Sequence, residues 1–337
     1  MLKIQEIKDK KVWEDFIDRA DFYPFFQSWD WGDVQKNLGR KILRIGAYEE
    51  TLLIGVCLVI EINARRGRYL HLRHGPVFLV FDERKLDAIL DFIKKEASRR
   101  GSSFIRISPL LNKDSESEKI LQKKGFINSP IHNMDAETCL ILDLEKSEED
   151  LLKEMRKTHR YLIRKAQNMG IKIIRTQKVS DLNSFLDIYK NLSKRKHFVP
   201  HSDVKEEFEL FVEDDQAVLF LASFRKKIIC GAIIIFAGNM AIYHHGASLD
   251  EFRDVPISYL LQWEAILEAK KRGKKLYNFW GITPLDKPNH PWKGITLFKT
   301  GFGGTRLEFM HAKDLPLNIW YWKSFLIEFY TKWKKGY

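Results

Sequence analysis

Cysteine is scarce in this sequence. The chain of 337 residues has three cysteines, Cys57, Cys139 and Cys230, which lie far apart and form no CxxC pair. This spacing suggests neither a disulfide framework nor a cysteine-based zinc site. Cys57 and Cys230 lie inside apolar runs, where a cysteine is usually a small buried hydrophobic residue. The pattern fits a reducing compartment, so we expect a cytoplasmic protein.

Long apolar runs are also absent. The longest are about nine residues, well short of the ~20 that span a bilayer. The N-terminus, MLKIQEIKDKKVWEDF, lacks the unbroken apolar core of a signal peptide. No His/Asp/Glu group has the spacing of metal ligands, and no spacing supports a Ser-His-Asp or Cys-His arrangement. We therefore expect neither a bound metal nor a covalent enzyme intermediate.

Positive charge is in excess. Lys and Arg number 57 against 45 Asp and Glu, which gives a net charge of +12. Nucleic acid, phosphorylated metabolites and acidic lipid headgroups are all anionic partners that fit this charge. A lysine-rich solvated surface explains the charge equally well.

The two halves of the chain repeat one order of elements. Gly55 falls opposite Gly231, and Gly101 opposite Gly273. Each half reads as a hairpin, a third strand, an amphipathic helix with a glycine stop, and a last strand, 104–107 or 276–280. A hairpin followed by a helix that crosses back to a parallel strand is an α/β sandwich.

This order is that of the GCN5-related N-acyltransferase fold. We predict an α+β chain of two tandem domains of this type, each a mixed sheet with flanking helices. The first is predicted to span 1–145 and to be completed by a C-terminal helix at 315–337, and the second to span 146–314.

Two predicted helices combine apolar and basic residues. Ser147 and Asp150 form a capping box ahead of a helix with an apolar stripe. The opposite face of this helix is basic: Lys153, Arg156, Lys157, Arg160, Arg164 and Lys165. It is either solvated or faces nucleic acid. The helix at 315–337 mixes aromatics with lysine; we expect it to pack on the body, with contact to a membrane surface as the alternative.

One lysine stands beside a glycine run. Lys299 lies between Phe298 and Gly301, Gly303 and Gly304, in the string LFKTGFGG. A glycine-rich turn lets the backbone aim N–H groups at negative charge, and a lysine at its rim adds a mobile cation. The combination suits a site for an oxyanion or a phosphate, although a plain turn is the common meaning of such a run.

Several strings occur together in order: QSWDWGDVQKNLG, IRKAQNMGIKI, YHHGAS, SYLLQWEAILEAKKRG, LYNFWGI and HPWKGITLFKTGFGG. Over nearly its whole length the chain resembles the Fem family of peptidoglycan-precursor aminoacyltransferases. The resemblance implies transfer of an amino acid from aminoacyl-tRNA to the side-chain amine of the third stem-peptide residue. The acceptor would be lipid II or the soluble UDP-MurNAc-pentapeptide, with no further cofactor and with the protein as a monomer.

The helical arm that some family members use for tRNA has no room in this sequence, so tRNA would be held by the basic surface of the body. The resemblance also assigns site residues. Lys299 would be a catalytic cation near the reacting ester or the terminal adenosine phosphate, and the carbonyl of Phe298 would orient the attacking amine. Lys36 and Arg195, or Lys196 in a shifted register, would bind the acceptor phosphate from different domains and place the acceptor in the cleft between them.

Further acceptor contacts fall on YHHGAS, where Tyr243 and His245 match the family's paired aromatics. By strand alternation His244 should point to the other face. The glycines Gly301 and Gly303 would line the substrate site. Two positions depart from the family: Ser108 and Asn278 stand where relatives commonly have aspartate, so a general base at position 108 is excluded.

Two other functions remain open. An acyl-CoA or acyl-carrier-dependent N-acyltransferase on the same fold would need a pyrophosphate loop of the form R/Q-x-x-G-x-G/A at the start of a helix. The nearest match, residues 65–68, precedes a predicted strand. A non-enzymatic RNA-binding protein would use the basic helix but would leave Lys299 without a purpose.

Overall fold

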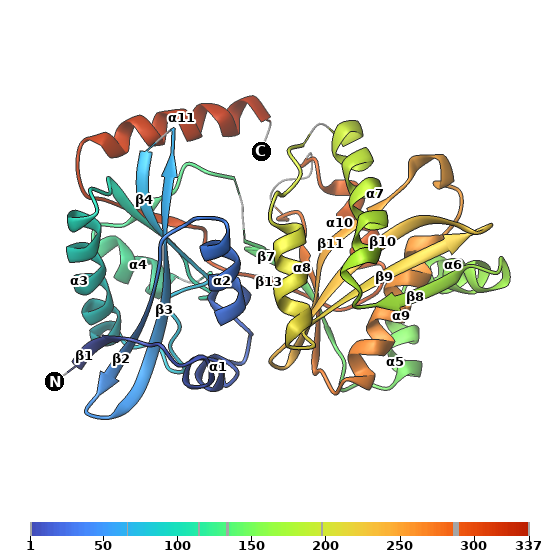
Figure 1. Cartoon of the computed structure of the whole chain (residues 1–337), viewed down its shortest axis with the longest axis horizontal. Coiled ribbons are helices and arrows are strands. Elements are labelled where there is room, and N and C mark those ends of the chain that lie inside the picture. Colours follow the sequence, from blue (N-terminus) through green and yellow to red (C-terminus); the bar gives the residue numbers. More distant parts are fainter. Residues whose placement is uncertain are drawn as a thin grey trace. The chain divides into compact units, whose positions relative to one another are not determined.

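The computed structural model describes residues 2–65, 67–113, 115–132, 135–196, 198–285 and 290–335 (Figure 1). The chain forms two compact units. Unit 1 comprises 1–138, 283–291 and 307–337, and unit 2 comprises 139–282 and 292–306.

Unit 1 is built on a seven-stranded sheet with the order β1-β2-β3-β4-β5-β14-β6. Its strands are β1 (Leu2–Glu6), β2 (Ile42–Glu49), β3 (Leu52–Ala64), β4 (Gly67–Arg73), β5 (Phe104–Ser108), β6 (Ile127–Asn128) and β14 (Lys313–Pro316). Its helices are α1 (Lys10–Ile17), the short η1 (Phe25–Gln27), α2 (Trp29–Asn37), α3 (Glu83–Arg99), α4 (Ser115–Lys123) and α11 (Trp320–Lys335).

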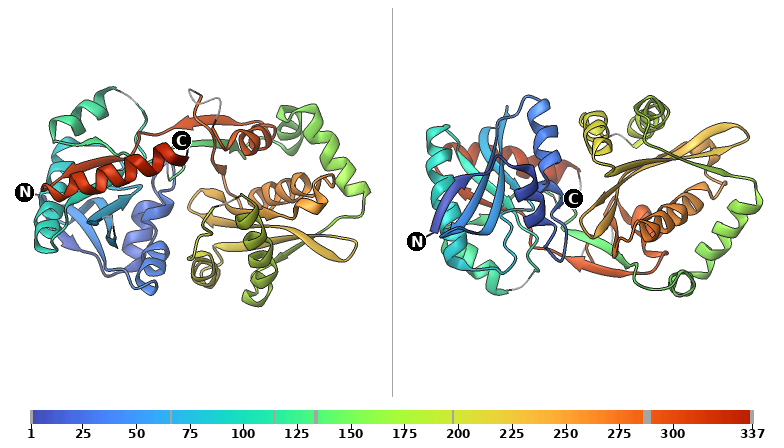
Figure 2. Two further views of the ribbon diagram at one scale, coloured as in Figure 1. Left: turned by 90° about the horizontal axis from the view of Figure 1, so that it is seen from above. Right: turned by 60° about the horizontal axis from the view of Figure 1, so that its bottom comes forward.

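Unit 2 has a second seven-stranded sheet with the order β13-β7-β12-β11-β10-β9-β8. Its strands are β7 (Thr138–Asp143), β8 (Lys172–Thr176), β9 (Ala217–Phe224), β10 (Lys227–Ala237), β11 (Met240–Ser248), β12 (Leu276–Gly281) and β13 (Thr305–Glu308). Its helices are α5 (Glu148–Glu154), α6 (Lys157–Asn168), η2 (Val179–Asp181), α7 (Leu182–Lys196), α8 (Val204–Glu213), η3 (Asp250–Phe252), α9 (Ile257–Lys271) and α10 (Lys293–Thr300). Helices α7 and α8 cover one face of this sheet, and α6 and α9 the other (Figure 2).

The predicted repeat is present in both sheets. The strands β2, β3 and β4 are antiparallel, and α3 returns the chain to β5, parallel to β4. The strands β9, β10 and β11 repeat this pattern, and α9 leads to β12, parallel to β11. Gly101 and Gly273 end the two crossover helices at φ +65° and +70°, a left-handed conformation that favours glycine. The predicted α+β class with two mixed sheets is confirmed.

The end of the chain belongs to unit 1. Strand β14 pairs with β5 and β6, and α11 follows it in the same unit. Strand β7, in contrast, pairs with β12 in the sheet of unit 2. The boundary predicted at residue 145 therefore falls beyond a strand that the structure places in the second sheet.

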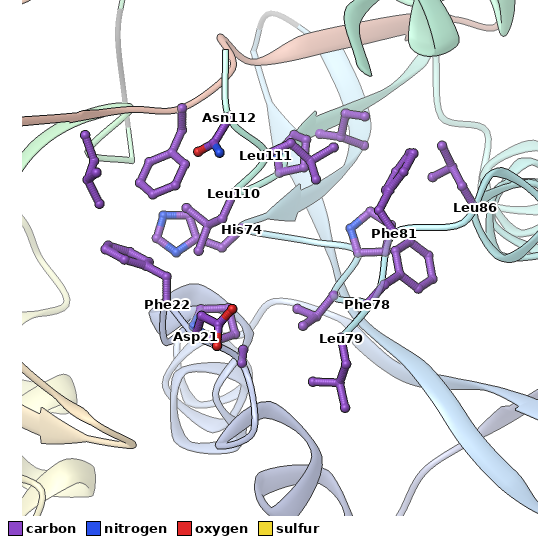
Figure 3. Close-up of a pocket in the computed structure, with 18 of the residues that line it drawn as sticks. Asp21, Phe22, His74, Phe78, Leu79, Phe81, Leu86, Leu110, Leu111 and Asn112 are labelled. Carbon is purple, nitrogen blue, oxygen red and sulfur yellow. The ribbon is translucent and has the colours of Figure 1, made fainter. Parts of the chain in front are cut away.

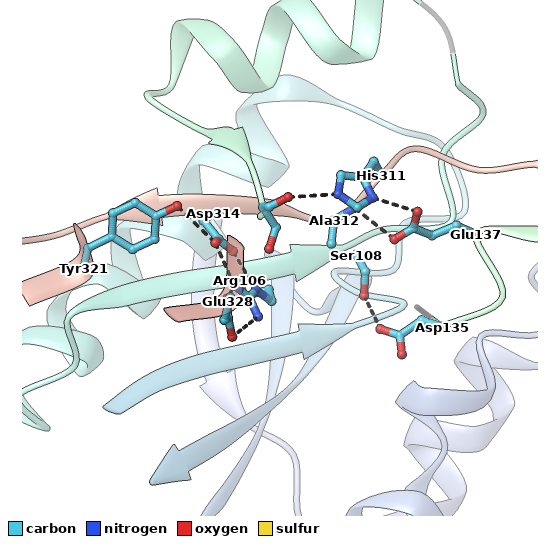
Figure 4. A network of polar contacts seen from close by, with 10 residues as sticks. Arg106, Ser108, Asp135, Glu137, His311, Ala312, Asp314, Tyr321 and Glu328 are labelled. Carbon is cyan, nitrogen blue, oxygen red and sulfur yellow. Dashed lines mark hydrogen bonds and ion pairs between the residues drawn. The ribbon is translucent and has the colours of Figure 1, made fainter. Parts of the chain in front are cut away.

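A buried ion network fixes this chain end (Figure 4). The Arg106 guanidinium on β5 donates to both carboxylate oxygens of Asp314 on β14, at 2.7 and 2.8 Å. It also donates to both oxygens of Glu328 on α11, at 3.2 and 2.6 Å, and Tyr321 donates to Asp314 at 3.2 Å. Arg106 is only 1% exposed. One cation thus holds both final elements of the chain.

The burial of the cysteines and the lengths of the helices agree with what the sequence predicts. Cys57 and Cys230 are buried and free, as is Cys139. None of the helices in the described part of the chain combines the length and the apolar character of a membrane span.

Replacing Arg106 with methionine should destabilise the protein by about 3–5 kcal/mol, because Asp314 and Glu328 would stay buried without their cation. Urea denaturation measures this change. The control is Arg99→Met: Arg99 is 71% exposed in its side chain and pairs with Glu96 at the surface, so its loss should cost less than about 1 kcal/mol. Equal effects of the two changes would contradict the anchoring role.

Candidate active site

Lys299 lies in the last turn of α10 and is buried, with 5% exposure. Its Nζ donates to the carbonyl oxygen of Gly281 at 2.8 Å and lies 5.6 Å from the ring centre of Tyr243. Burial lowers the pKa of Lys299 to about 7. The prediction of a mobile cation at the rim of a turn is wrong: the helix holds this amine inside unit 2, where it titrates near neutrality.

The end of β12 supplies the oxygen that Lys299 contacts. Trp280 has φ +65°, which is unusual for a bulky residue, and its N–H donates to the Asn278 side-chain oxygen at 2.7 Å. The β12–β7 register shifts between Asn278 and Gly281. Asn278, which stands where family members commonly have aspartate, therefore holds a strained bend. Its own Nδ2 is buried without a hydrogen-bond partner among the described residues.

The carbonyl of Phe298 has protein donors. His159 Nε2 donates to it at 2.9 Å, and the N–H of Gly301 at 3.2 Å. A carbonyl oxygen has two lone pairs, and these donors use both. The structure therefore does not support the prediction that this carbonyl orients the attacking amine.

His159 was not singled out in the sequence, because one histidine in a basic helix carries no signal of its own. Its ring packs edge-on against Tyr259 and Phe302. Since Nε2 donates to Phe298, Nδ1 is an acceptor, and it is buried without a hydrogen-bond partner in the described residues. Burial lowers the pKa of His159, which keeps the imidazole neutral.

The glycine run serves close packing. A Cβ on Gly301 would lie 1.8 Å from the His159 ring, and one on Gly304 would lie 2.4 Å from the carbonyl oxygen of Ile141. Gly303 and Gly304 have φ +89° and +86°. The N–H groups of Gly301 and Gly303 donate to carbonyls of α10, at 3.2 and 3.4 Å. In the structure these N–H groups form hydrogen bonds within the turn. The sequence had predicted that they face a substrate.

The predicted basic helix is two helices, α5 and α6, that break at Met155 and Arg156. The capping role of Ser147 is confirmed. Arg156 donates to the carbonyl of Leu297 and the hydroxyl of Thr300, so it ties α6 to α10. Arg160 donates to three carbonyls near the end of α5: those of Leu152, Lys153 and Met155. Two of the predicted basic side chains are therefore structural.

A bulge in β11 determines the orientation of the residues that were predicted to contact the acceptor. Tyr243 pairs with Ile234 and His245 with Ile233, so His244 is the extra residue. His244 Nδ1 lies 2.7 Å from one carboxylate oxygen of Glu207 on α8, and His245 Nε2 lies 3.3 Å from the other. The predicted alternation is wrong at this point, because the bulge turns both imidazoles toward one carboxylate.

Glu207, His244 and His245 are also residues that could hold a metal ion. Their ligand atoms lie within 4.8 Å of one another, and imidazole with carboxylate suits first-row transition metals. In the structure the imidazoles satisfy the carboxylate directly. Burial would raise the pKa of Glu207, but the two histidines outweigh burial and lower it. Sequence spacing did not indicate this cluster because the fold joins it from a helix and a strand.

The remaining phosphate-binding candidates lie at helix ends. Arg195, in the last turn of α7, pairs with Asp250 at 2.8 Å, and Lys196 beside it is exposed. Lys36 is exposed in the last turn of α2. Lys36 belongs to unit 1, whereas Arg195, Tyr243, His245 and Lys299 belong to unit 2.

A carboxylate does lie beside Ser108. The Ser108 hydroxyl donates to Asp135 at 2.8 Å (Figure 4), and Arg73 Nε donates to the same carboxylate at 2.8 Å. Burial would raise the pKa of Asp135, but Arg73 and His71 outweigh burial and lower it. This carboxylate is ionised and already paired, so it is not poised to remove a proton.

Unit 1 also has a cavity of about 360 Å³ that lies at the carboxyl ends of the parallel strands β4 and β5 (Figure 3). Its lining includes Phe22, His74, Phe78, Phe81, Leu110 and Leu111. Ligands of α/β sheets commonly bind at such strand ends.

The FemAB family model matches residues 9–137, 131–227 and 222–327. The chain belongs to the FemAB family. The resemblance noted in the sequence is therefore confirmed.

Relatives of this FemAB chain include the lipid II:glycine glycyltransferase of Staphylococcus epidermidis, which is 21% identical over 86% of each chain. A solved structure of FemX covers 97% of this chain and 100% of its own, with a TM-score of 0.83 and 19% identity. A tandem GNAT protein from the clavulanic acid biosynthesis pathway covers 94% of this chain and 98% of its own, with a TM-score of 0.60 and 9% identity. Both structures share the tandem fold.

We predict that Gly301→Ala destabilises the protein by about 1–3 kcal/mol, because the new methyl group overlaps the His159 ring. The control lies at the start of α10, whose C-cap is Gly301: a Cβ on Gly294 meets open space, so Gly294→Ala should stabilise by up to about 1 kcal/mol. Chemical denaturation measures both changes.

A double mutant tests the cause. His159→Ala removes the ring, so Gly301→Ala should cost much less in that background than in the wild type. An unchanged cost in the double mutant would mean that the strain lies elsewhere in the turn.

Proposed function

We propose that this protein transfers an amino acid from aminoacyl-tRNA to the side-chain amine of the stem peptide of a peptidoglycan precursor. The observation that carries the proposal is membership of the FemAB family along most of the chain, with relatives named lipid II:glycine glycyltransferases. Aminoacyl-tRNA and the precursor's soluble form are both cytoplasmic molecules, so the reaction belongs in the cytoplasm.

The reaction is a direct acyl transfer. The neutral acceptor amine attacks the ester carbonyl carbon and forms a C–N bond, and the carbonyl oxygen takes the negative charge. The C–O bond to the ribose then breaks, and the proton lost by the nitrogen passes to the ribose oxygen. The ester is already activated, so positioning and oxyanion stabilisation can supply much of the rate increase, and no cofactor is needed.

Lys299 is the residue suited to the oxyanion. A buried ammonium interacts more strongly with a developing negative charge than an exposed one, because the local dielectric constant is low. With its pKa near 7, Lys299 is charged in only part of the molecules at neutral pH. The developing charge would itself favour the protonated amine, so stabilisation is greatest in the transition state.

The acceptor would be bound by other residues that the sequence analysis assigned to the site. Tyr243 lies on the same strand as His245 and beside Lys299, which supports contact of this ring with the acceptor near the reacting amine. Arg195 of unit 2 is proposed to bind the acceptor phosphate. Because Arg195 pairs with Asp250, phosphate binding would exchange that carboxylate for a phosphate oxygen.

The tRNA surface is proposed to lie on α6. Lys157, Tyr161 and Lys165 are exposed and follow one another at four-residue intervals, with Arg164 exposed next to them. Residues four apart share one face of a helix. Lysines separated by an aromatic ring suit an RNA backbone, since the cations contact phosphates and the ring can stack on a base.

The acyl-CoA alternative has little support. Gly67 and Arg68, from the string at 65–68, are the first residues of β4, so a strand follows there, as predicted, and not a helix. The crossover helix α3 opens with the Asp82 carboxylate, which accepts from the N–H groups of Arg84 and Lys85. A carboxylate at this place occupies the helix terminus that a pyrophosphate would need.

A transfer assay tests the proposed function. Purified protein would receive labelled aminoacyl-tRNA from a mixed pool, with UDP-MurNAc-pentapeptide or lipid II carrying either lysine or diaminopimelate. Label on one of these acceptors supports the proposal. Transfer from acyl-CoA and from none of the charged tRNAs would support the alternative.

The charge of Lys299 should give the reaction a defined pH dependence. Lys299→Gln keeps a hydrogen-bond donor but has no charge, so the wild type should be about 100-fold faster at pH 6. Above pH 7 the wild-type amine loses its proton, and the ratio of wild-type to variant rates should fall. Single-turnover rates of both proteins from pH 6 to 9 measure this ratio. Because the acceptor amine ionises equally in both reactions, its ionisation does not affect the ratio. A ratio that stays constant through pH 7 would exclude a role for the charge.

Replacing Lys157 and Lys165 together with glutamine should raise KM for aminoacyl-tRNA roughly tenfold and leave kcat unchanged. The slope of log KM against log salt should fall by about two, because two phosphate contacts are lost. The control with equal charge loss is Lys11→Gln/Lys205→Gln, at exposed positions on α1 and α8. If control and test pairs raise KM equally, the effect is that of net charge and α6 is not the tRNA surface.

A further inference from the structure

Helix α11 carries its apolar stripe on the outside. Its buried side chains are Tyr321, Ser324 and Glu328, and Glu328 is held by Arg106. The large apolar residues Trp322, Leu326, Phe329, Tyr330 and Trp333 are exposed, with Trp322 at 49% and Trp333 at 72%. Their spacing of i, i+4, i+7, i+8 and i+11 follows one face of a helix.

This arrangement reverses the usual orientation of a surface helix, whose apolar face packs on the core. The expectation that the helix packs on the body is confirmed for the narrow face that carries Tyr321, Ser324 and Glu328. The remaining stripe is extended at the start of the helix by Ile319 and Trp320, which are also exposed. Contiguous exposed apolar surface of this kind marks an interaction site.

Positive charge borders the stripe. Lys323 and Lys334 are exposed on α11 beside the aromatic residues. A pocket of about 250 Å³ at the start of the helix is lined by Arg65, Arg68, Asn318, Trp320 and Lys323, among others. Three cations around one small pocket suit a phosphate group. The pocket and the stripe share Trp320 and Lys323 at one end of the same helix.

We infer that α11 docks this protein on the surface of an anionic phospholipid bilayer. The aromatic stripe would enter the boundary between headgroups and acyl chains, where Trp and Tyr are favoured. Lys323 and Lys334 would contact the headgroups, and the Arg65–Arg68–Lys323 pocket would hold one lipid phosphate. The net charge of +12 favours an anionic surface over a neutral one.

The fold supports this use of the helix in one further way. The Arg106 network and the packing of Tyr321 on Phe104 hold one face of α11 inward, so the residues of the exposed stripe are not needed for this attachment. The inference rests on this surface of unit 1 alone and is independent of the proposed transfer reaction. It would also place the protein beside an acceptor that is carried on a lipid.

Sedimentation with vesicles tests the inference on the full-length protein. At low salt, vesicles of phosphatidylcholine with a quarter of phosphatidylglycerol should bind the protein at least tenfold more tightly than pure phosphatidylcholine. Trp322→Ser/Trp333→Ser should weaken that binding at least tenfold, whereas Val80→Ser/Val199→Ser, at exposed positions outside α11, should not. Tryptophan fluorescence should shift to shorter wavelength on binding in the wild type.

A second pair tests the phosphate pocket. Arg65→Gln/Lys323→Gln should weaken binding to the anionic vesicles several-fold more than Lys11→Gln/Lys205→Gln, which removes equal charge. Circular dichroism and thermal unfolding establish that each variant is folded.

Three results would overturn the inference. The first is no preference of the wild type for anionic vesicles, and the second is equal binding by the aromatic variant and its valine control. The third is a lipid-free dimer, seen by sedimentation equilibrium, that Trp322→Ser/Trp333→Ser converts to a monomer. That result would assign the stripe to a second copy of the chain.

Discussion

A buried cation is unfavourable unless other groups compensate its charge, and Arg106 and Lys299 differ in how far this compensation goes. Arg106 is surrounded by two carboxylates that accept four of its hydrogen bonds. Its charge is fixed, and it holds the last strand and the last helix. Lys299 has a neutral carbonyl as its hydrogen-bond partner and an aromatic ring nearby. The second arrangement leaves the charge of the ammonium poorly compensated. Such a charge can interact strongly with an anionic transition state.

The environment of Lys299 depends on the packing of α10 against α6. His159 and Arg156, both at the start of α6, donate to the carbonyls of Phe298 and Leu297. Gly301 leaves room for the His159 ring. These contacts hold the turn that ends α10, so the lysine amine stays at the bend of β12. The glycine run is therefore important for the site through the packing of α10, because its N–H groups are used within the turn.

The two units share one plan and use it differently. Both have antiparallel strands, a crossover helix and a parallel strand, and each sheet is completed by a strand from elsewhere in the chain. Unit 2 places a buried lysine and a bulged strand near the end of its parallel pair. Unit 1 has a cavity at the same end of its own pair and carries the exposed stripe of α11. A repeated fold thus supports two different surfaces.

The sequence by itself determined the class of the fold, the repeat and the family. Glycine stops and apolar periodicity are local signals, so Gly101, Gly273 and the strands around them could be predicted. Lys299 was also indicated, because a lysine before a glycine run is visible without a structure. The tertiary structure decided what these residues do. Burial of Lys299, the His159 contact with Phe298 and the bulge that joins His244 and His245 to Glu207 all depend on segments distant in sequence. The outward orientation of the apolar stripe on α11 could not be predicted either. Helical spacing in the sequence shows that the stripe exists. Only the tertiary contacts of the opposite face show that the stripe faces outward.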